Sequence, residues 1–173
     1  MQMGRTKKLT LCALMTALAL ALSYTERFIP LQMIVPLPGV KLGLANIVTL
    51  VALYLLGGKC AFAIVLLRCF LGAMFGGGIT GFAFSVTGGV LAVAVMVAAA
   101  RLPWLSVFGV SILGAAAHNV GQICAAMALM QSVYAGAYLP YLLVVGLITG
   151  FAIGSAGAGV IKGLSLAKRS GSS

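Results

Sequence analysis

The amino-acid sequence predicts an all-α integral membrane protein, built as a six-helix transmembrane bundle. Of its 173 residues, 62% are hydrophobic and only 7% are charged, whereas about a quarter of the residues in an ordinary soluble domain are charged. The apolar residues form runs close to the ~20 residues that cross ~30 Å of hydrocarbon. None of these runs shows the two-residue alternation of a membrane β-barrel. We therefore expect a single transmembrane domain over residues 1–173.

Six apolar runs give the expected spans, which lie at approximately 9–25, 42–58, 60–76, 80–100, 105–130 and 138–161. The first follows basic residues and ends near Ala21-Leu22-Ser23, so a cleaved signal peptide is the alternative to a retained helix. The third carries Arg68 near its middle, and the fourth is rich in glycine. The fifth carries a polar group at 118–122. The sixth carries glycines every four residues from 146 to 154, a spacing that lets helix backbones approach closely.

The connection at 26–41 is the one long loop between the expected spans. Its three prolines prevent a regular helix, yet most of its other residues are apolar. We expect this loop to form a lid over the mouth of the bundle or, alternatively, to lie on the lipid interface.

The basic residues indicate the orientation of the bundle. With six spans, both termini share one side with the second-to-third and fourth-to-fifth connections. That side carries eight basic residues: Arg5, Lys7, Lys8, Lys59, Arg101, Lys162, Lys168 and Arg169. The other side carries Arg27 and Lys41. Because cytoplasmic loops hold the excess of Lys and Arg, we expect both termini in the cytoplasm.

Polar side chains at membrane depth mark the candidate site. An Arg at the centre of a spanning helix costs ~2.5–3.5 kcal/mol on insertion scales, so Arg68 needs a partner. Its partner is an anionic ligand or, alternatively, Glu26, the only acidic residue in the chain, a backbone carbonyl or water. Arg68 could also snorkel to the membrane interface. His118, Asn119 and Gln122 are spaced to share one helix face, where they serve either as interhelical hydrogen bonds or as a binding surface.

These residues predict a pocket that opens to the outside beneath the 26–41 loop. The basic residues Lys41 and Arg68 outnumber Glu26, which favours a ligand with an anionic end. The other residues of the pocket are apolar, which suits a ligand whose remaining part is flat or hydrophobic. The candidate substrate-binding residues are Lys41, Asn46, Arg68, Ser85, His118, Asn119, Gln122 and Tyr138.

Several function classes are excluded by what the sequence does not contain. With one Glu and no Asp, the chain can assemble neither a pair of catalytic carboxylates nor an Asp-rich magnesium site, and we expect no catalytic residues and no enzyme. Gly58-Lys59 is not part of a phosphate-binding loop. The first glycine of that motif is replaced by Leu53, and its final Ser or Thr is replaced by Cys60. The four cysteines form no metal-binding pattern, so we expect no metal and no cofactor. The basic residues lie at the ends of apolar runs, which argues against nucleic acid as a partner.

Two segments carry a resemblance to a known family. PGVKLGLANIVTL (38–50) and LRCFLGAMFGGGITGFAFSVTGGVLA (67–92) resemble the family called Gx transporter or heptaprenyl diphosphate synthase component I. More broadly, the small bundle, the long apolar outer loop and an alanine ridge on the first span resemble the substrate-binding S component of energy-coupling factor (ECF) transporters.

The resemblance implies a subunit of a bacterial plasma membrane that captures a small molecule from outside. Such a molecule would be vitamin-like or related to isoprenoids, quinones or flavins. The subunit would dock through Ala13, Ala17 and Ala21 onto a membrane scaffold joined to two ATPases, and would topple to deliver its ligand. The alternative is a non-catalytic membrane accessory of isoprenoid or quinone synthesis, or of flavin-based electron transfer. A purely structural partner of another complex is a third possibility.

Overall fold

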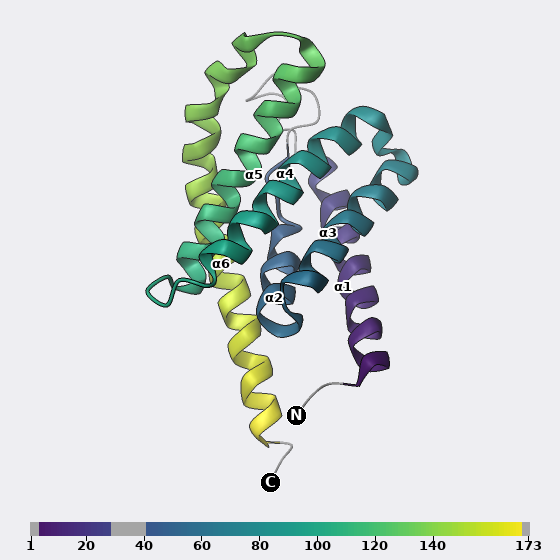
Figure 1. Cartoon of the computed structure of the whole chain (residues 1–173), viewed down its shortest axis with the longest axis vertical. Helices are drawn as coiled ribbons and strands as arrows, with labels where there is room; N and C mark the ends of the chain where they lie inside the picture. Colours follow the sequence, from purple (N-terminus) through teal and green to yellow (C-terminus); the bar gives the residue numbers. More distant parts are fainter. Residues whose placement is uncertain (1–3, 29–40, 171–173) are drawn as a thin grey trace.

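The computed structural model describes residues 4–28 and 41–170, and every regular element in these ranges is helical. The long helices are α1 (Arg5–Thr25), α2 (Asn46–Leu56), α3 (Gly58–Gly72), α4 (Gly78–Ala99), α5 (Val107–Met130) and α6 (Leu139–Ser170). Short helical turns precede or follow some of them: η1 (Glu26–Phe28), the π-helical η3 (Ala73–Gly77) and η4 (Val133–Tyr138). Figure 1 shows these helices as one bundle.

The prediction of an all-α membrane bundle is confirmed, but that of six spanning helices is not. Within the described ranges, four helical stretches are long and apolar enough to cross a membrane: Arg5–Thr25, Gly58–Ala99, Val107–Met130 and Val133–Leu164. Helix α2 occupies the expected span 42–58 but has only 11 residues, a length of about 16 Å. This is about half of the ~30 Å that a span must cover.

The expected spans 60–76 and 80–100 belong to a single helical stretch of 42 residues, Gly58–Ala99. This stretch is broken in η3, where Phe75 and Gly76 have non-helical backbone angles and Gly76 has a φ of 94°. A residue with a β-carbon rarely adopts such a φ. Helices α3 and α4 pack against each other on the two sides of this break, so the glycines reverse the chain into a helical hairpin (Figure 1).

Helix α5 packs between α4 and α6 and forms the centre of the bundle. Ser106 is its N-cap, and the Oγ of Ser106 accepts a hydrogen bond from the backbone N–H of Gly109 at 3.2 Å, as N-cap side chains do. A β-carbon on Gly121 would lie 2.6 Å from the carbonyl oxygen of Thr87, and one on Gly150 would lie 2.8 Å from Cα of Ile112. The glycines of the sixth expected span are therefore used for packing inside the bundle.

Helix α1 lies at the edge of the bundle, where it packs against α2 and α3. Its buried residues are Thr16, Ala19 and Ser23. The neighbouring row of Ala13, Ala17 and Ala21 is exposed. The predicted docking ridge is thus accessible for contact with lipid or another protein, and its role as a partner interface stays a prediction.

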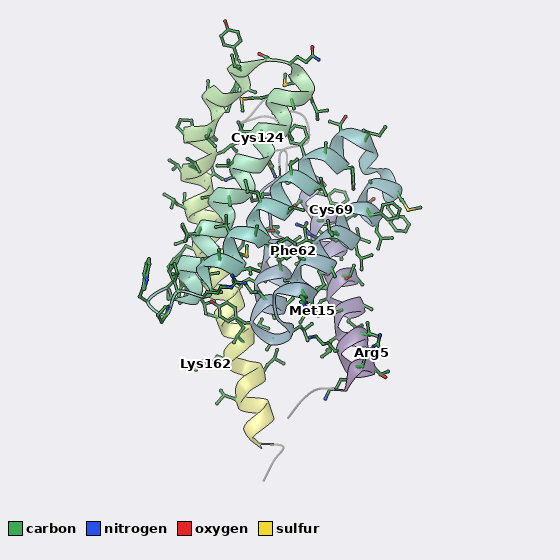
Figure 2. All side chains as sticks on the ribbon, viewed as in Figure 1. Arg5, Met15, Phe62, Cys69, Cys124 and Lys162 are labelled. Carbon is green, nitrogen blue, oxygen red and sulfur yellow. The ribbon has the colours of Figure 1, made fainter. Side chains whose placement is uncertain are left out.

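The start of α1 and the end of α6 lie at the same end of the molecule. Helix α1 begins and α6 ends toward the bottom of Figure 1, and Arg5 and Lys162 both lie in the lower half of Figure 2. This placement agrees with termini on one side of a membrane, and which side that is stays a prediction.

Candidate ligand cavity

A cavity of about 490 Å³ lies between α1 and the α3–α4 hairpin. This volume falls within the range of small-molecule sites, about 300–1,000 Å³. The cavity is lined by Ala17, Leu20, Ala21, Ser23, Tyr24, Lys41, Arg68, Cys69, Gly72, Phe75 and Ser85. Cys69, one of the lining residues, is buried and is labelled in Figure 2.

Two cationic side chains and a hydroxyl form the polar end of the cavity. The ammonium Nζ of Lys41 donates a hydrogen bond to Ser85 Oγ at 2.7 Å. Arg68 is only 3% exposed, and its Nη2 donates a long hydrogen bond of 3.5 Å to Asn46 Oδ1. Its Nε has no hydrogen-bond partner among the residues that the structure describes. A buried guanidinium with an unused N–H donor can still donate a hydrogen bond to an anionic group.

Glu26 lies behind this polar end and is 4% exposed. Its carboxylate accepts a hydrogen bond from the backbone N–H of Leu44. Burial raises the pKa of this carboxyl group, while the Leu44 hydrogen bond and the charges of Arg68 and Lys41 act in the opposite direction. The carboxyl group of Glu26 therefore interacts electrostatically with both cations of the cavity.

Gln122 holds the backbone of Lys41 in place from α5. Its Oε1 accepts from the Lys41 N–H and its Nε2 donates to the Lys41 carbonyl oxygen, both at 3.0 Å. The same Nε2 lies 2.6 Å from Nε2 of His118. Gln122 and His118 are 0% and 2% exposed and do not line the cavity. Gln122 holds the backbone of Lys41, and His118 contacts Gln122.

The remaining predicted site residues lie at different distances from the cavity. Asn46 is buried beside Arg68, and the Nδ2 of Asn119 donates to the carbonyl oxygen of Leu142 at 2.6 Å, which joins α5 to α6. Tyr138 packs near Phe84 and Ile123 in a separate apolar cluster. The structure thus brings Lys41, Arg68 and Ser85 to the cavity wall, while Asn119 and Tyr138 lie apart from it. Their roles in ligand binding stay predictions.

Sequence reasoning missed the wall formed by α1 and by the residues after Arg68. Ala17 and Ala21 were expected only at a partner interface, yet both line the cavity. Cys69, Gly72 and Phe75 were not selected at all. The signal for Gly72 was present, because a residue four positions after Arg68 lies on the same helix face.

The predicted lid cannot be placed, since residues 29–40 lie outside the described residues. Lys41, at the end of that loop, is described and points its ammonium group at Ser85.

The comparisons with known proteins give one match. The family model for heptaprenyl diphosphate synthase component I matches residues 15–160, a range that contains the cavity and most of the bundle. Neither curated proteins nor solved structures gave a match. Because the family model covers most of the chain, the protein belongs to the heptaprenyl diphosphate synthase component I family.

Proposed function

We propose that the protein is a membrane subunit that binds a small molecule from outside, similar to an ECF S component. The observation that carries this proposal is the cavity, whose polar end combines Lys41 with the buried Arg68. An arginine at membrane depth is costly unless it faces a partner or a cavity. A ligand with an anionic end gives Arg68 that partner.

The charge pattern supports an outward-facing site. If the termini lie in the cytoplasm, as the excess of basic residues favours, α1 runs outward and ends near Thr25. The cavity is lined by the second half of α1, from Ala17 to Tyr24. The cavity then lies in the outer half of the membrane.

Partners would supply the energy for transport. The chain has one Glu, one His and no Asp, which is little equipment for ion coupling or catalysis. We propose a non-catalytic subunit that uses the exposed Ala13, Ala17 and Ala21 to contact a scaffold joined to ATPases.

A second candidate follows from the family name. A membrane component of a heptaprenyl diphosphate synthase system would bind an isoprenoid or quinone precursor and pass it to a catalytic partner. An accessory of flavin-based electron transfer belongs to the same class. Both candidate functions use the same cavity, and they differ in the partner protein.

The first test is mass spectrometry of small molecules that remain bound to the protein in mild detergent. We expect one anionic compound with the wild type and at least a tenfold loss with Arg68→Gln, which removes the charge but keeps a hydrogen-bonding side chain. Arg101→Gln is the control, because Arg101 is exposed in the connection between α4 and α5. Equal retention by wild type and Arg68→Gln would contradict the proposal.

The partners that copurify from native membranes separate the two candidates. ATPase subunits would support the transport role, whereas a prenyl transferase would support the accessory role.

A further inference from the structure

The mouth of the cavity has a different character from its floor. At the floor, Arg68 and Ser85 are 3% and 6% exposed. At the mouth, Tyr24 of α1 and Phe75 of η3 are 49% and 64% exposed, although both line the cavity. The cavity is therefore charged and closed at one end, and apolar and open at the other.

The open end runs along the side of α1. Ala17, Leu20, Ala21 and Tyr24 line the cavity, and their spacing of three and four residues places them on one helix face. From Ala17 to Tyr24 this face extends about 10 Å along the helix axis. Ala17 and Ala21 line the cavity and are also exposed, so the cavity reaches the surface beside α1, at a gap left by these two small side chains.

This gap lies at membrane depth. Helix α1 is one of the stretches long and apolar enough to cross a membrane, and Ala17 lies eight residues before its last residue, Thr25. A gap at Ala17 in a spanning helix faces lipid hydrocarbon. Water-soluble ligands do not approach a site from that direction, whereas amphiphiles with an apolar tail do.

We propose that the ligand is an anionic amphiphile that enters the cavity sideways from the bilayer, between α1 and the α3–η3 segment. Its phosphate or carboxylate head binds Lys41 and the unused Nε donor of Arg68. Its apolar tail leaves past Ala17 and Ala21 into the lipid. The inference rests on the proposed function, since it specifies the ligand class and the access route of the same site.

The ligand class is tested by binding to the full chain in phosphatidylcholine nanodiscs. The probes are radiolabelled farnesyl diphosphate (head and tail), inorganic diphosphate (head alone), farnesol (tail alone) and palmitate (a carboxylate with a tail). We expect farnesyl diphosphate to bind at least tenfold more tightly than inorganic diphosphate or farnesol. Palmitate binding as tightly as farnesyl diphosphate would support an amphiphile with a fatty-acid source.

The access route is tested with tryptophans at the gap. Ala17→Trp and Ala21→Trp should each weaken farnesyl diphosphate binding at least tenfold. Ala13→Trp is the matched control, because Ala13 belongs to the same exposed ridge but does not line the cavity. It should change binding less than twofold. An equal effect at all three positions would contradict the proposed route.

A second measurement needs no variant. A farnesyl diphosphate analogue with a photoreactive diazirine at the tail end should label α1 between Ala17 and Tyr24, or η3. Labelling confined to α5 or α6 would overturn the inference.

The inference and the proposed function fail in different ways. If inorganic diphosphate or another small soluble anion binds as well as farnesyl diphosphate, and the tryptophans have no effect, the inference is wrong while the capture function stands. If the purified protein retains no compound and binds no probe, both are wrong.

Discussion

Arg68 and Gln122 show how differently two buried polar residues of this chain are used. Arg68 lines the cavity and has an Nε donor without a hydrogen-bond partner in the described part of the chain. Gln122 uses both polar atoms of its amide, with two bonds to the backbone of Lys41 and a contact with His118. The first residue has the donor that the proposed ligand needs, and the second holds the backbone of Lys41 in position.

Gln122→Met tests this positioning role, because methionine has a similar shape but makes neither hydrogen bond to Lys41. The backbone N–H and carbonyl of Lys41 then lose their partner, and each such loss costs about 1–3 kcal/mol. We expect a lower melting temperature in detergent and weaker retention of the bound compound.

Gln131→Met is the matched control, since Gln131 is exposed at the end of α5. It should leave both readouts near the wild-type values. A Gln122→Met protein as stable and as well loaded as the wild type would refute the positioning role.

At the scale of the elements, α6 is tied to α5 by glycines and by backbone acceptors. Ser111 Oγ donates to the carbonyl oxygen of Gly150 at 2.7 Å, and Asn119 donates to that of Leu142. These bonds need the two helix backbones to lie close together, which the small residues of α6 allow.

Gly150→Ala should therefore destabilise the bundle. The added β-carbon would lie 2.8 Å from Cα of Ile112, a backbone atom that cannot move alone, and overpacking of this kind costs about 1–3 kcal/mol. Thermal unfolding in detergent measures the effect.

Gly159→Ala in the same helix is the control, because its β-carbon would meet nothing within 4 Å. Alanine is the better helix former, so stability should stay equal or rise. If both variants unfold at the wild-type temperature, the close α5–α6 packing described here is wrong.

The helical membrane character of the whole molecule could be predicted from the sequence, because apolar content and run length report it directly. The number of spans could not. The run 42–58 is apolar enough for a span, but helix α2 starts only at Asn46, after the turn at Gly43, which has a φ of 81°. A hydropathy pattern does not report where a glycine turn shortens a helix.

Some residues of the candidate site could be predicted from the sequence, and others could not. Arg68 and Lys41 stand out because charge is costly in hydrocarbon, and both line the cavity. His118 and Asn119 stand out for the same reason but are buried outside its lining, since polarity alone does not separate a ligand contact from an interhelical hydrogen bond. The alanines of α1 could be identified from the sequence as a ridge. That two of them also line the cavity could not, because this depends on tertiary packing.

The central proposal is that the cationic cavity between α1 and the α3–α4 hairpin holds an anionic group. The most direct measurement is an electron cryo-microscopy map of the protein purified from its native membrane without added ligand. We predict density in the cavity with an anionic head within hydrogen-bonding distance of Arg68 Nε and Lys41 Nζ, and an apolar part directed toward Ala17 and Ala21. A cavity filled by the protein itself, with Arg68 Nε bonded to a protein group, would contradict the account.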